Sequence, residues 1–265
     1  MQQTIETEII YGKNAVTELL KSETGVDTVL LADTLDAKVA GYFTALAKNA
    51  GAVVKTTRTE KLNNLCGEGK HQGVAAFAAQ ITYYSLEELL QKAAEQNTGP
   101  PFILLADGVE DPHNLGALMR TAFLCGAHGV VIPKRGAAAV TPVVLKASAG
   151  AAARLPVARV ANIGEAIRRL KQQNVFIYCA DMDGPPAFKQ NLTGAIGLVV
   201  GAEGKGVSPL VKKLCDGVVS LPMAVQQGSG VDSFNVSVAG GIVLYEIYRQ
   251  RQEAAPENQP QNTAF

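Results

Sequence analysis

The 265-residue sequence contains no tryptophan, only three histidines and only four cysteines. No two histidines have the spacing of metal ligands on one helix face, and no cysteines have the Cys-x-x-Cys spacing of zinc sites. The scattered cysteines also argue against a disulfide framework, so we expect them to be small buried hydrophobic residues. The three histidines are His71, His113 and His128, and the four cysteines are Cys66, Cys125, Cys179 and Cys215. We therefore predict no metal site.

Long apolar runs are absent as well. No stretch approaches the roughly 18 apolar residues that a membrane span requires. The opening MQQTIETEII has neither the basic segment nor the apolar segment of a signal peptide. We therefore expect a cytosolic (cytoplasmic) protein with no membrane partner.

Excess charge of either sign is missing, because 24 basic and 24 acidic residues cancel. This balance argues against an indiscriminate polyanion binder but permits a local basic patch. Between Lys134 and Lys171, eight basic residues are accompanied by one acidic residue, Glu165. Phosphate binding by part of this segment and an ordinary solvated helix face are equal alternatives.

The composition that is present, 47% hydrophobic with 26 glycines, is typical of a globular α/β protein. Alternating helix-like and strand-like segments predict a small α/β domain over residues 1–79. Residues 80–101 end in paired prolines, which favour extended chain, so we assign them to a linker. We expect a second domain over residues 102–251 and a frayed polar tail over residues 252–265.

The expected second domain alternates apolar runs with helical segments. Runs such as FILLA, VFIYCA and IGLVV are typical of strands that are buried on both faces. They predict an α/β fold with a parallel sheet covered by helices, and a last helix over about 233–250.

The first candidate functional segment is DGVEDPHNLGALMR, residues 107–120. It reads as a loop entering a helix, with Asn114 where an N-terminal cap is needed. Apolar residues then recur with helical period, and Arg120 falls about 140° from the middle of their stripe. Arg120 must therefore point away from the main core, as a functional or an ordinary exposed arginine would.

The second segment is IGLVVGAEGKG, residues 196–206. A strand runs into a loop with three glycines, which allow backbone amides to approach a ligand closely. Glu203 lies inside this loop. The pattern matches neither the dinucleotide fingerprint nor the Walker A motif, and a simple tight turn is the alternative.

The third segment is DSFNVSVAGG, residues 232–241. Asp232, Ser233 and Asn235 stand at a helix start, where they can cap the helix or bind polar ligand groups. Gly240 and Gly241 each cost the helix about 1 kcal/mol relative to alanine. Close approach of another backbone, such as that of a partner subunit, would offset this cost.

The three segments together resemble the motifs of the SpoU family of RNA 2′-O-ribose methyltransferases, within the SPOUT superfamily. The matching stretches are DPHNLGALMR, GAEGKG followed by LPM, and SFNVSVA, and their order and spacing agree across residues 102–251. The N-terminal stretch from YGKNAV to GKHQGVAAF resembles the substrate-binding, L30e-like domain of the branch that methylates a guanosine in 23S ribosomal RNA. The resemblance therefore covers nearly the whole chain.

The resemblance implies a homodimer that uses S-adenosylmethionine to methylate a guanosine 2′-hydroxyl in 23S ribosomal RNA. It also implies a trefoil knot on the C-terminal side of the sheet, an exception to the rule that chains avoid threading. The cofactor is expected in the knotted loops, held largely by backbone groups at positions matching Gly201, Leu221 and Phe234. Most relatives carry leucine at the last of these positions.

The resemblance further assigns the reaction to Arg120, with Asn114, Glu203, Ser233 and Asn235 shaping the site. A guanidinium with a pKa above about 12 is a poor proton acceptor. We therefore expect Arg120 to stabilise the emerging alkoxide and bind the adjacent phosphate, and the proton acceptor stays open. In-line positioning of oxygen and methyl should supply much of the rate.

Two segments are candidates for RNA binding. The loop GEGKHQG presents Lys70, His71 and Gln72 among glycines, and either contacts an RNA backbone or is a solvated turn. Lys134 and Arg135 open the basic segment and are expected to contact RNA phosphates.

Three alternatives remain. The chain is a non-catalytic RNA-binding protein on the same scaffold, a transfer RNA 2′-O-methyltransferase, or an enzyme that acts at a ribosomal site conferring antibiotic resistance. A nicotinamide-dependent enzyme is disfavoured because the dinucleotide fingerprint is missing.

Overall fold

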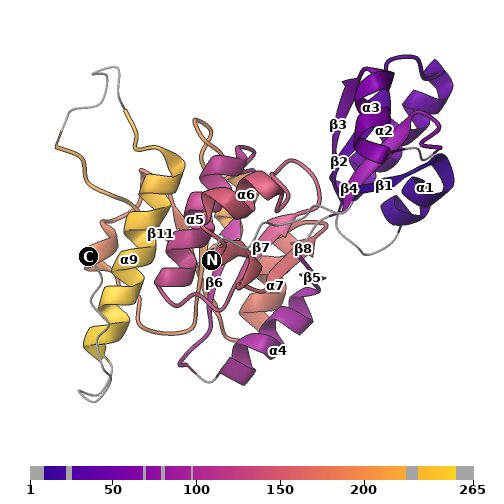
Figure 1. Ribbon diagram of the computed structural model, residues 1–265. Coiled ribbons are helices and arrows are strands. Elements are labelled where there is room, and N and C mark those ends of the chain that lie inside the picture. Colours follow the sequence, from indigo (N-terminus) through magenta and orange to yellow (C-terminus); the bar gives the residue numbers. More distant parts are fainter. Residues whose placement is uncertain are drawn as a thin grey trace.

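The computed structural model describes residues 9–21, 26–67, 70–78, 81–96, 98–224 and 232–254. Within these residues the chain forms two α/β units, each built on its own sheet (Figure 1). The expected fold class, α/β with a parallel-sheet second domain, is confirmed.

The smaller unit has a four-stranded sheet in the order β1-β4-β2-β3. Its elements are β1 (Ile9–Tyr11), α1 (Lys13–Lys21), β2 (Val26–Ala32), α2 (Ala37–Ala50), β3 (Val53–Thr57), α3 (Thr59–Cys66) and β4 (Val74–Ala78). Every residue of β2 is buried, because α1 and α2 pack on one face of the sheet and α3 packs on the other. The sheet is mixed, with β2 and β3 parallel and the remaining neighbours antiparallel.

The larger unit has a seven-stranded sheet in the order β11-β9-β10-β6-β7-β8-β5, and all its paired neighbours are parallel. Its strands are β5 (Tyr83–Tyr84), β6 (Phe102–Ala106), β7 (Gly129–Pro133), β8 (Val157–Val160), β9 (Phe176–Ala180), β10 (Ile196–Val200) and β11 (Gly217–Val219). Its helices are α4 (Leu86–Gln96), α5 (Pro112–Leu124), α6 (Pro142–Ala147), α7 (Ile163–Gln172), α8 (Pro209–Leu214) and α9 (Val236–Ala254). Short 3-10 turns occupy Ala151–Ala153 and Ala187–Lys189.

Helices cover both faces of this sheet, so its central strands are apolar throughout. In β6, Leu104 belongs to the core shared with α5, α6 and α9, whereas Ile103 and Leu105 belong to the core shared with α4 and α7. Because a core lies on each face, β6 and β10 are buried at every position.

Part of the segment that the sequence assigns to a linker is regular structure. Strand β5 pairs with β8 at the sheet edge, and α4 buries Leu86, Leu89 and Ala93. The polar helix candidate is amphipathic, and this apolar stripe anchors it to the larger unit. The connection between units is therefore shorter than residues 80–101.

The carboxyl ends of β6 and β10 meet at one edge of the sheet. After β6 the chain turns to β7 on one side, whereas β10 lies on the other side, which is the switch point where α/β sheets bind ligands. The two loops are tied there, since Asp107 N donates to Val200 O at 2.8 Å and Ser208 N donates to Asp107 Oδ2 at 2.9 Å. The first two candidate segments therefore meet in space.

The last helix begins later and ends later than the sequence predicts. Its bounds are Val236–Ala254, so it includes the first residues of the expected tail. Residues 255–265 lie outside the described residues. Over the described ranges, we find no helix with the length and apolar character to span a membrane.

Candidate functional site

Three polar side chains, one from each candidate segment, form a closed hydrogen-bonded ring. Asn114 Nδ2 donates to Glu203 Oε2 at 3.2 Å, and Asn235 Nδ2 donates to Glu203 Oε1 at 2.9 Å. Asn235 Nδ2 also donates to Asn114 Oδ1 at 3.1 Å. Both oxygens of the Glu203 carboxylate are thus occupied by amide donors, which holds it in one orientation.

The start of α5 explains why Asn114 is available for this ring. The interpretation of Asn114 as the helix cap is wrong, because Asp111 caps α5 and accepts a 3.0 Å hydrogen bond from His113 N. Pro112 follows at the first helical position, where its missing N–H costs nothing. Asn114 lies inside the first turn and is buried, with its amide directed to Glu203.

Asn235 is the N-terminal cap of α9. Its Oδ1 accepts from Ser237 N at 3.0 Å and from Ser237 Oγ at 2.7 Å. Since the oxygen is used by the helix, the amide nitrogen must face the other way, toward Glu203. One side chain therefore both begins α9 and completes the ring.

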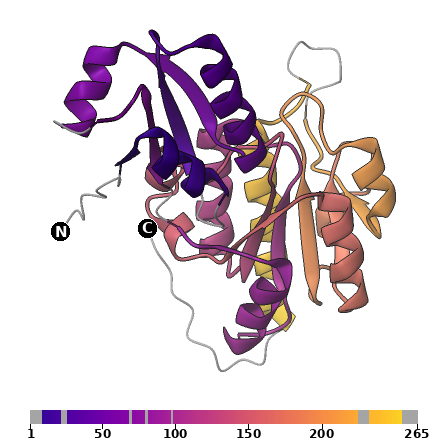
Figure 2. The same cartoon turned by 90° about the vertical axis from the view of Figure 1, so that its right-hand side faces the viewer.

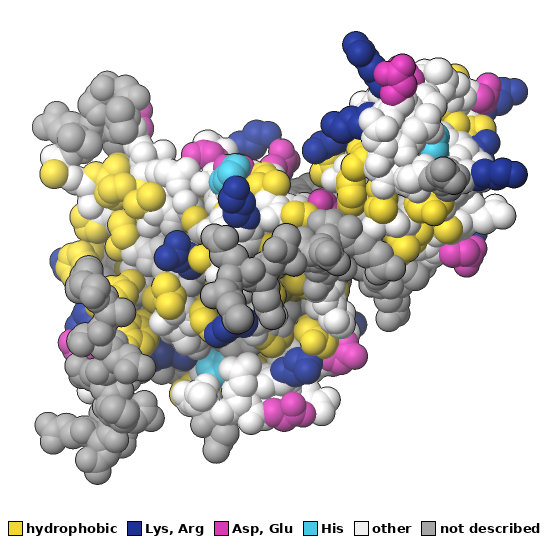
Figure 3. Space-filling view, in the orientation of Figure 1, with side chains coloured by type: hydrophobic (Ala, Val, Ile, Leu, Met, Phe, Trp, Pro, Cys, Tyr) yellow, Lys and Arg dark blue, Asp and Glu magenta, His cyan; other side chains and the backbone are white. Residues whose placement is uncertain are grey.

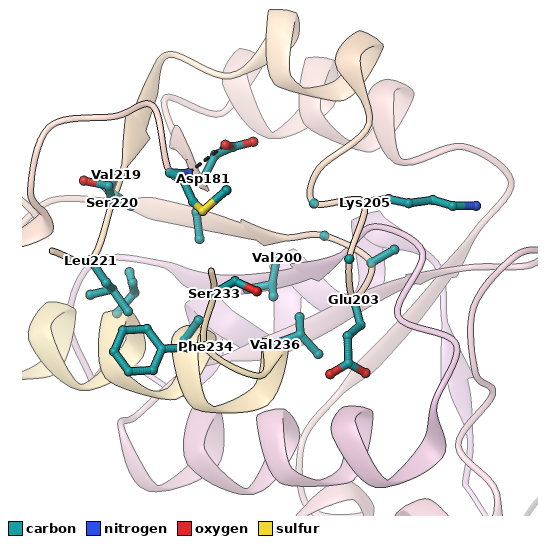
Figure 4. A pocket seen from close by; sticks show the side chains of 18 of the residues that line it. Asp181, Val200, Glu203, Lys205, Val219, Ser220, Leu221, Ser233, Phe234 and Val236 are labelled. Atoms are coloured by element: carbon teal, nitrogen blue, oxygen red, sulfur yellow. Dashed lines mark hydrogen bonds between the residues drawn. The ribbon is translucent and has the colours of Figure 1, made fainter. Parts of the chain in front are cut away.

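The loop that carries Glu203 depends on glycine. Ala202 and Gly206 exchange backbone hydrogen bonds of 3.0 and 2.8 Å, and Gly204 and Gly206 have φ of +75° and +67°. A Cβ on Gly201 would overlap the backbone at Gly206 and Val207. The tight turn places Glu203 and Lys205 on the same loop, with their side chains leaving it in different directions (Figure 4).

A cavity of about 240 Å³ adjoins this loop (Figure 4). Its walls come from the ends of β9, β10 and β11, the loop around Glu203 and the first turns of α9. All three positions that the resemblance assigns to the cofactor line it: Gly201, Leu221 and Phe234. Ser233 also lines it, so the third segment contributes both to the cavity and to the ring.

The cavity is lined by both apolar and polar side chains. Val200, Leu221 and Val243 supply apolar surface, whereas Glu203 and Ser233 supply polar groups. Such a site suits a small ligand with a flat or apolar body and a few polar substituents.

Sequence reasoning missed two charged wall residues, Lys205 in the Glu203 loop and Asp181 directly after β9. Asp181 has partners in the structure. Its carboxylate forms a 3.1 Å salt bridge with Lys212, and Lys212 forms a second one of 2.7 Å with Asp183. These contacts tie β9 to α8 beside the cavity. The polar residues that directly follow the apolar run VFIYCA were the signal available in the sequence.

Arg120 is not part of the ring. Its side chain is exposed on α5, as its angular position predicts. It makes no hydrogen bond or salt bridge within the described part of the chain, and it does not line the cavity. The ring and cavity form within one chain, and the Arg120 guanidinium is free to meet another molecule.

The glycine-rich loop of the smaller unit divides into exposed and buried residues. Lys70 and Gln72 are exposed. The His71 ring is buried, where Nδ1 accepts from Gly73 N at 3.0 Å and Nε2 bonds Asn63 Oδ1 at 2.7 Å. The structure therefore gives His71 two internal partners and leaves its neighbours open to solvent.

The basic segment has two parts with different surroundings. Arg168, Arg169 and Lys171 form salt bridges with carboxylates on α7, α4 and the loop before β11. Lys134 and Arg135 are exposed and lie beside the smaller unit. The solvated-face interpretation thus fits the first group. Lys134 and Arg135 form no salt bridge within the described residues, and the same holds for the exposed Lys146 and Arg154 of this segment.

The interior contains no site built from metal ligands among the described residues, where no three His, Cys, Asp or Glu side chains are grouped to hold an ion. The four cysteines are free, and three of them are buried.

Gly240 packs against the Leu118 and Val200 side chains, which explains one of the two glycines in α9 without a second backbone.

The parallel sheet with the Glu203 loop and a cavity at its switch point has the arrangement of a ligand-binding α/β protein. Residues 101–245 match the SpoU rRNA methylase family, and residues 9–84 match the RNA 2′-O ribose methyltransferase substrate-binding family. The chain belongs to the SpoU family of RNA methylases. The resemblance drawn from the three motifs is confirmed.

Relatives match along nearly the whole chain. A protein of Bacillus subtilis (strain 168), described as a TrmH family tRNA/rRNA methyltransferase, is 42% identical over 246 residues, covering 92% of this chain and 96% of its own. A similarly described protein of Staphylococcus saprophyticus is 35% identical over 250 residues, covering 93% and 97%. Both units therefore occur together in these relatives.

Solved structures share the fold. The SpoU methyltransferase AviRb from Streptomyces viridochromogenes, determined in complex with AdoMet, has a TM-score of 0.58 at 23% identity and covers 92% of this chain and 90% of its own. An RNA methyltransferase of the TrmH family from Porphyromonas gingivalis has a TM-score of 0.54 at 25% identity, covering 91% and 89%.

Proposed function

We propose that this protein transfers the methyl group of S-adenosylmethionine to the 2′-oxygen of a ribose in RNA, with a guanosine of 23S ribosomal RNA as the substrate. The observation that carries the proposal is the ring of Asn114, Glu203 and Asn235 beside the cavity lined by Gly201 and Phe234. These are the positions at which the SpoU motifs resemble this sequence. A polar ring next to a ligand cavity supports group transfer between two bound molecules.

The lining of the cavity fits the chemistry of the cofactor. Leu221 and Phe234 offer apolar and aromatic surface for an adenine, and the close-packed Gly201 leaves backbone groups in reach of polar atoms. Bound there, S-adenosylmethionine supplies an electrophilic methyl group on sulfur. Ser233, on the cavity wall beside the ring, is placed to orient the ligand near the ring. The trefoil knot belongs to this proposal, supported by the convergence of loop and helix segments on the cavity.

The residues of this chain position the ribose and stabilise the charge that develops on its oxygen. The Glu203 ring fixes the loop and presents polar atoms for a ribose, which is held in line for attack. Arg120 stays protonated, so its guanidinium stabilises the developing alkoxide and binds the phosphate next to it.

A homodimer brings Arg120 into this reaction. Apolar side chains gather over α9 on one side of the molecule (Figure 3). Val238 and Ile242 are 49% and 43% exposed on α9, and Leu124 is 69% exposed on α5. Arg120 stands one turn before Leu124, on the same side of α5. A second copy covering this patch removes it from water and places Arg120 between the subunits.

The choice of 23S ribosomal RNA rests on the smaller unit. Residues 9–84 match the substrate-binding family, and Lys70, Gln72, Lys134 and Arg135 are exposed cations or polar groups suited to phosphates. The relatives' descriptions as tRNA/rRNA methyltransferases make transfer RNA the competing substrate.

The decisive experiment mixes the purified protein with methyl-labelled S-adenosylmethionine and either 23S RNA fragments or transfer RNA. We expect label in a ribose 2′-position of 23S RNA, and mapping of 2′-O-methyl groups in RNA from a deletion strain should identify the same nucleotide. Label in transfer RNA alone would correct the substrate. Absence of label together with absence of cofactor binding would instead identify a non-catalytic RNA-binding protein.

A further inference from the structure

A second cavity, of about 570 Å³, lies between the two units. One wall is the carboxyl end of α2 with the start of β3, including Lys48 and Asn49. The opposite wall is the segment after β7, including Lys134 and Arg135, with Glu110 from the loop before α5. The smaller unit lies beside the β8 end of the larger sheet (Figure 1), and in Figure 2 it is nearer to the viewer than the larger unit. Neither unit alone contains this cavity.

The cavity carries excess positive charge. Three exposed cations, Lys48, Lys134 and Arg135, line it against one carboxylate, Glu110. None of the three forms a salt bridge with any residue that the structure describes. Unpaired cations gathered on a concave surface attract a polyanion more strongly than the same charges dispersed on a flat one.

The two walls are held in register by a packed contact. Gly51 ends α2 with φ of +72°, and a Cβ there would overlap the Arg159 guanidinium and the Lys134 carbonyl. The guanidinium lies 5.1 Å from the centre of the Tyr83 ring, whose hydroxyl accepts from Val140 N at 2.9 Å. Burial lowers the pKa of Arg159 and raises the pKa of Tyr83, as expected where water is excluded.

A hydrogen bond crosses the cavity itself. Arg135 Nη2 donates to Asn49 Oδ1 at 2.6 Å. Since Asn49 is neutral, this bond orients the guanidinium without cancelling its charge. The fork of Arg135 retains other N–H groups for an anion.

The cavity adjoins the proposed reaction site. Pro112 lines the cavity and Asn114 belongs to the ring, and both are in the first turn of α5. At 1.5 Å per residue these two residues are only about 3 Å apart along the helix axis, and residues at that spacing point to different sides of the helix, so the cavity and the ring flank the start of α5. The cavity therefore lies on the side of α5 where a phosphate neighbouring a ribose at the ring can be bound.

We propose that this cavity between the units binds an RNA phosphate adjacent to the methylated nucleotide, with Lys48 and Arg135 as the anion-binding groups and Asn49 orienting Arg135. The proposal rests on the RNA methyltransferase function above and adds a substrate contact from α2. It gives the smaller unit a contact close to the reaction, in addition to its exposed loop at Lys70.

The test compares full-length wild type with Lys48→Ala, Arg135→Ala and the double variant, using a labelled 23S RNA fragment. RNA affinity is measured across salt concentrations, with methyl transfer and S-adenosylmethionine binding measured in parallel. We expect affinity to fall about tenfold for each change, and the slope of log affinity against log salt to decrease by roughly 0.7 to 0.9 for each phosphate that the variant no longer neutralises. Cofactor binding should be unchanged.

Two further variants separate a phosphate contact from a general charge effect. Lys38→Ala removes an exposed cation from the first turn of the same helix, outside this cavity, and should leave the affinity and salt slope as in wild type. Asn49→Ala removes the orienting bond without altering charge, so it should weaken RNA binding at unchanged salt slope.

The outcomes distinguish this proposal from the proposed function. Wild type that methylates RNA, with Lys48 and Arg135 variants indistinguishable from it in affinity and slope, would overturn the cavity proposal alone. Wild type that binds RNA through these residues but transfers no methyl group would overturn the methyltransferase and leave the phosphate site standing. Equal losses in Lys38→Ala and Lys48→Ala would also overturn the cavity proposal.

Discussion

Asn235 donates a 3.1 Å hydrogen bond from Nδ2 to Oδ1 of Asn114, although 121 residues separate the two in the sequence. Both amides also donate to the Glu203 carboxylate. Because the Asn235 oxygen caps α9, the amide cannot rotate without freeing the first N–H groups of that helix. The orientation of the ring is therefore coupled to helix formation.

This coupling predicts different effects for two substitutions of Asn235. Asn235→Asp retains an oxygen for the cap but places a second carboxylate beside Glu203, so we expect methyl transfer to fall at least about 100-fold, with less than about 1 kcal/mol change in unfolding free energy. Asn235→Ala should lose transfer and about 1 kcal/mol of stability. Denaturant unfolding and label transfer measure the two effects. Full transfer by the aspartate variant would contradict the role of the ring.

Arg120→Ala should abolish methyl transfer and leave S-adenosylmethionine affinity within about twofold of wild type, because the guanidinium lies outside the cavity. Arg120→Lys should recover only part of the activity, since an ammonium lacks the planar fork. Arg168→Ala is the control, as that arginine is exposed and already paired with Glu165. Cofactor titration and single-turnover transfer test this, and normal transfer by the alanine variant would refute it.

Gly201→Ala should disrupt the cofactor cavity. The added Cβ would overlap backbone atoms at Gly206 and Val207, which can move only if the loop shifts. We expect a loss of roughly 1 to 3 kcal/mol in unfolding free energy and at least about tenfold in cofactor affinity. Gly194→Ala, where a Cβ meets no atom within 4 Å, should change neither quantity. Calorimetric titration measures the cofactor affinity and thermal unfolding measures the stability. Equal values for the two variants would contradict the prediction.

Ile242→Asp should dissociate the proposed dimer, because it buries a carboxylate in the apolar patch over α9. Sedimentation should then detect monomers, and transfer should fall with the dimer fraction because Arg120 loses its position. Leu210→Asp is the matched control, since Leu210 is 65% exposed on a different helix, α8. Dimers of unchanged affinity in the Ile242 variant, or a wild-type monomer with full activity, would overturn the dimer.

The strands were predictable because their apolar runs are nearly continuous. Every residue of β6 and β10 is buried. Strands that are buried on both faces consist almost entirely of apolar residues, and this composition can be recognised in the sequence. The helix boundaries were less predictable, since Asp111 and Asn114 are both good caps and only the chain path selects between them. The edge strand β5 has two residues, too few to show a period.

The sequence by itself determined the family and supplied the three segments from which the proposed site is built. Three short motifs contain Asn114, Glu203 and Asn235 in order, and glycines at 201, 204 and 206 permit the backbone that the loop requires. Local chemistry suffices for these inferences because each depends on only a few neighbouring residues.

Only the tertiary structure decided which groups meet. The parallel sheet brings the ends of β6 and β10 together, so residues 89 positions apart, Asn114 and Glu203, share a hydrogen bond. Packing of Gly51 against Arg159 creates the second cavity, and internal hydrogen bonds bury His71 in a loop that otherwise looks solvated. Long-range contacts depend on how whole elements pack, and no local pattern specifies them.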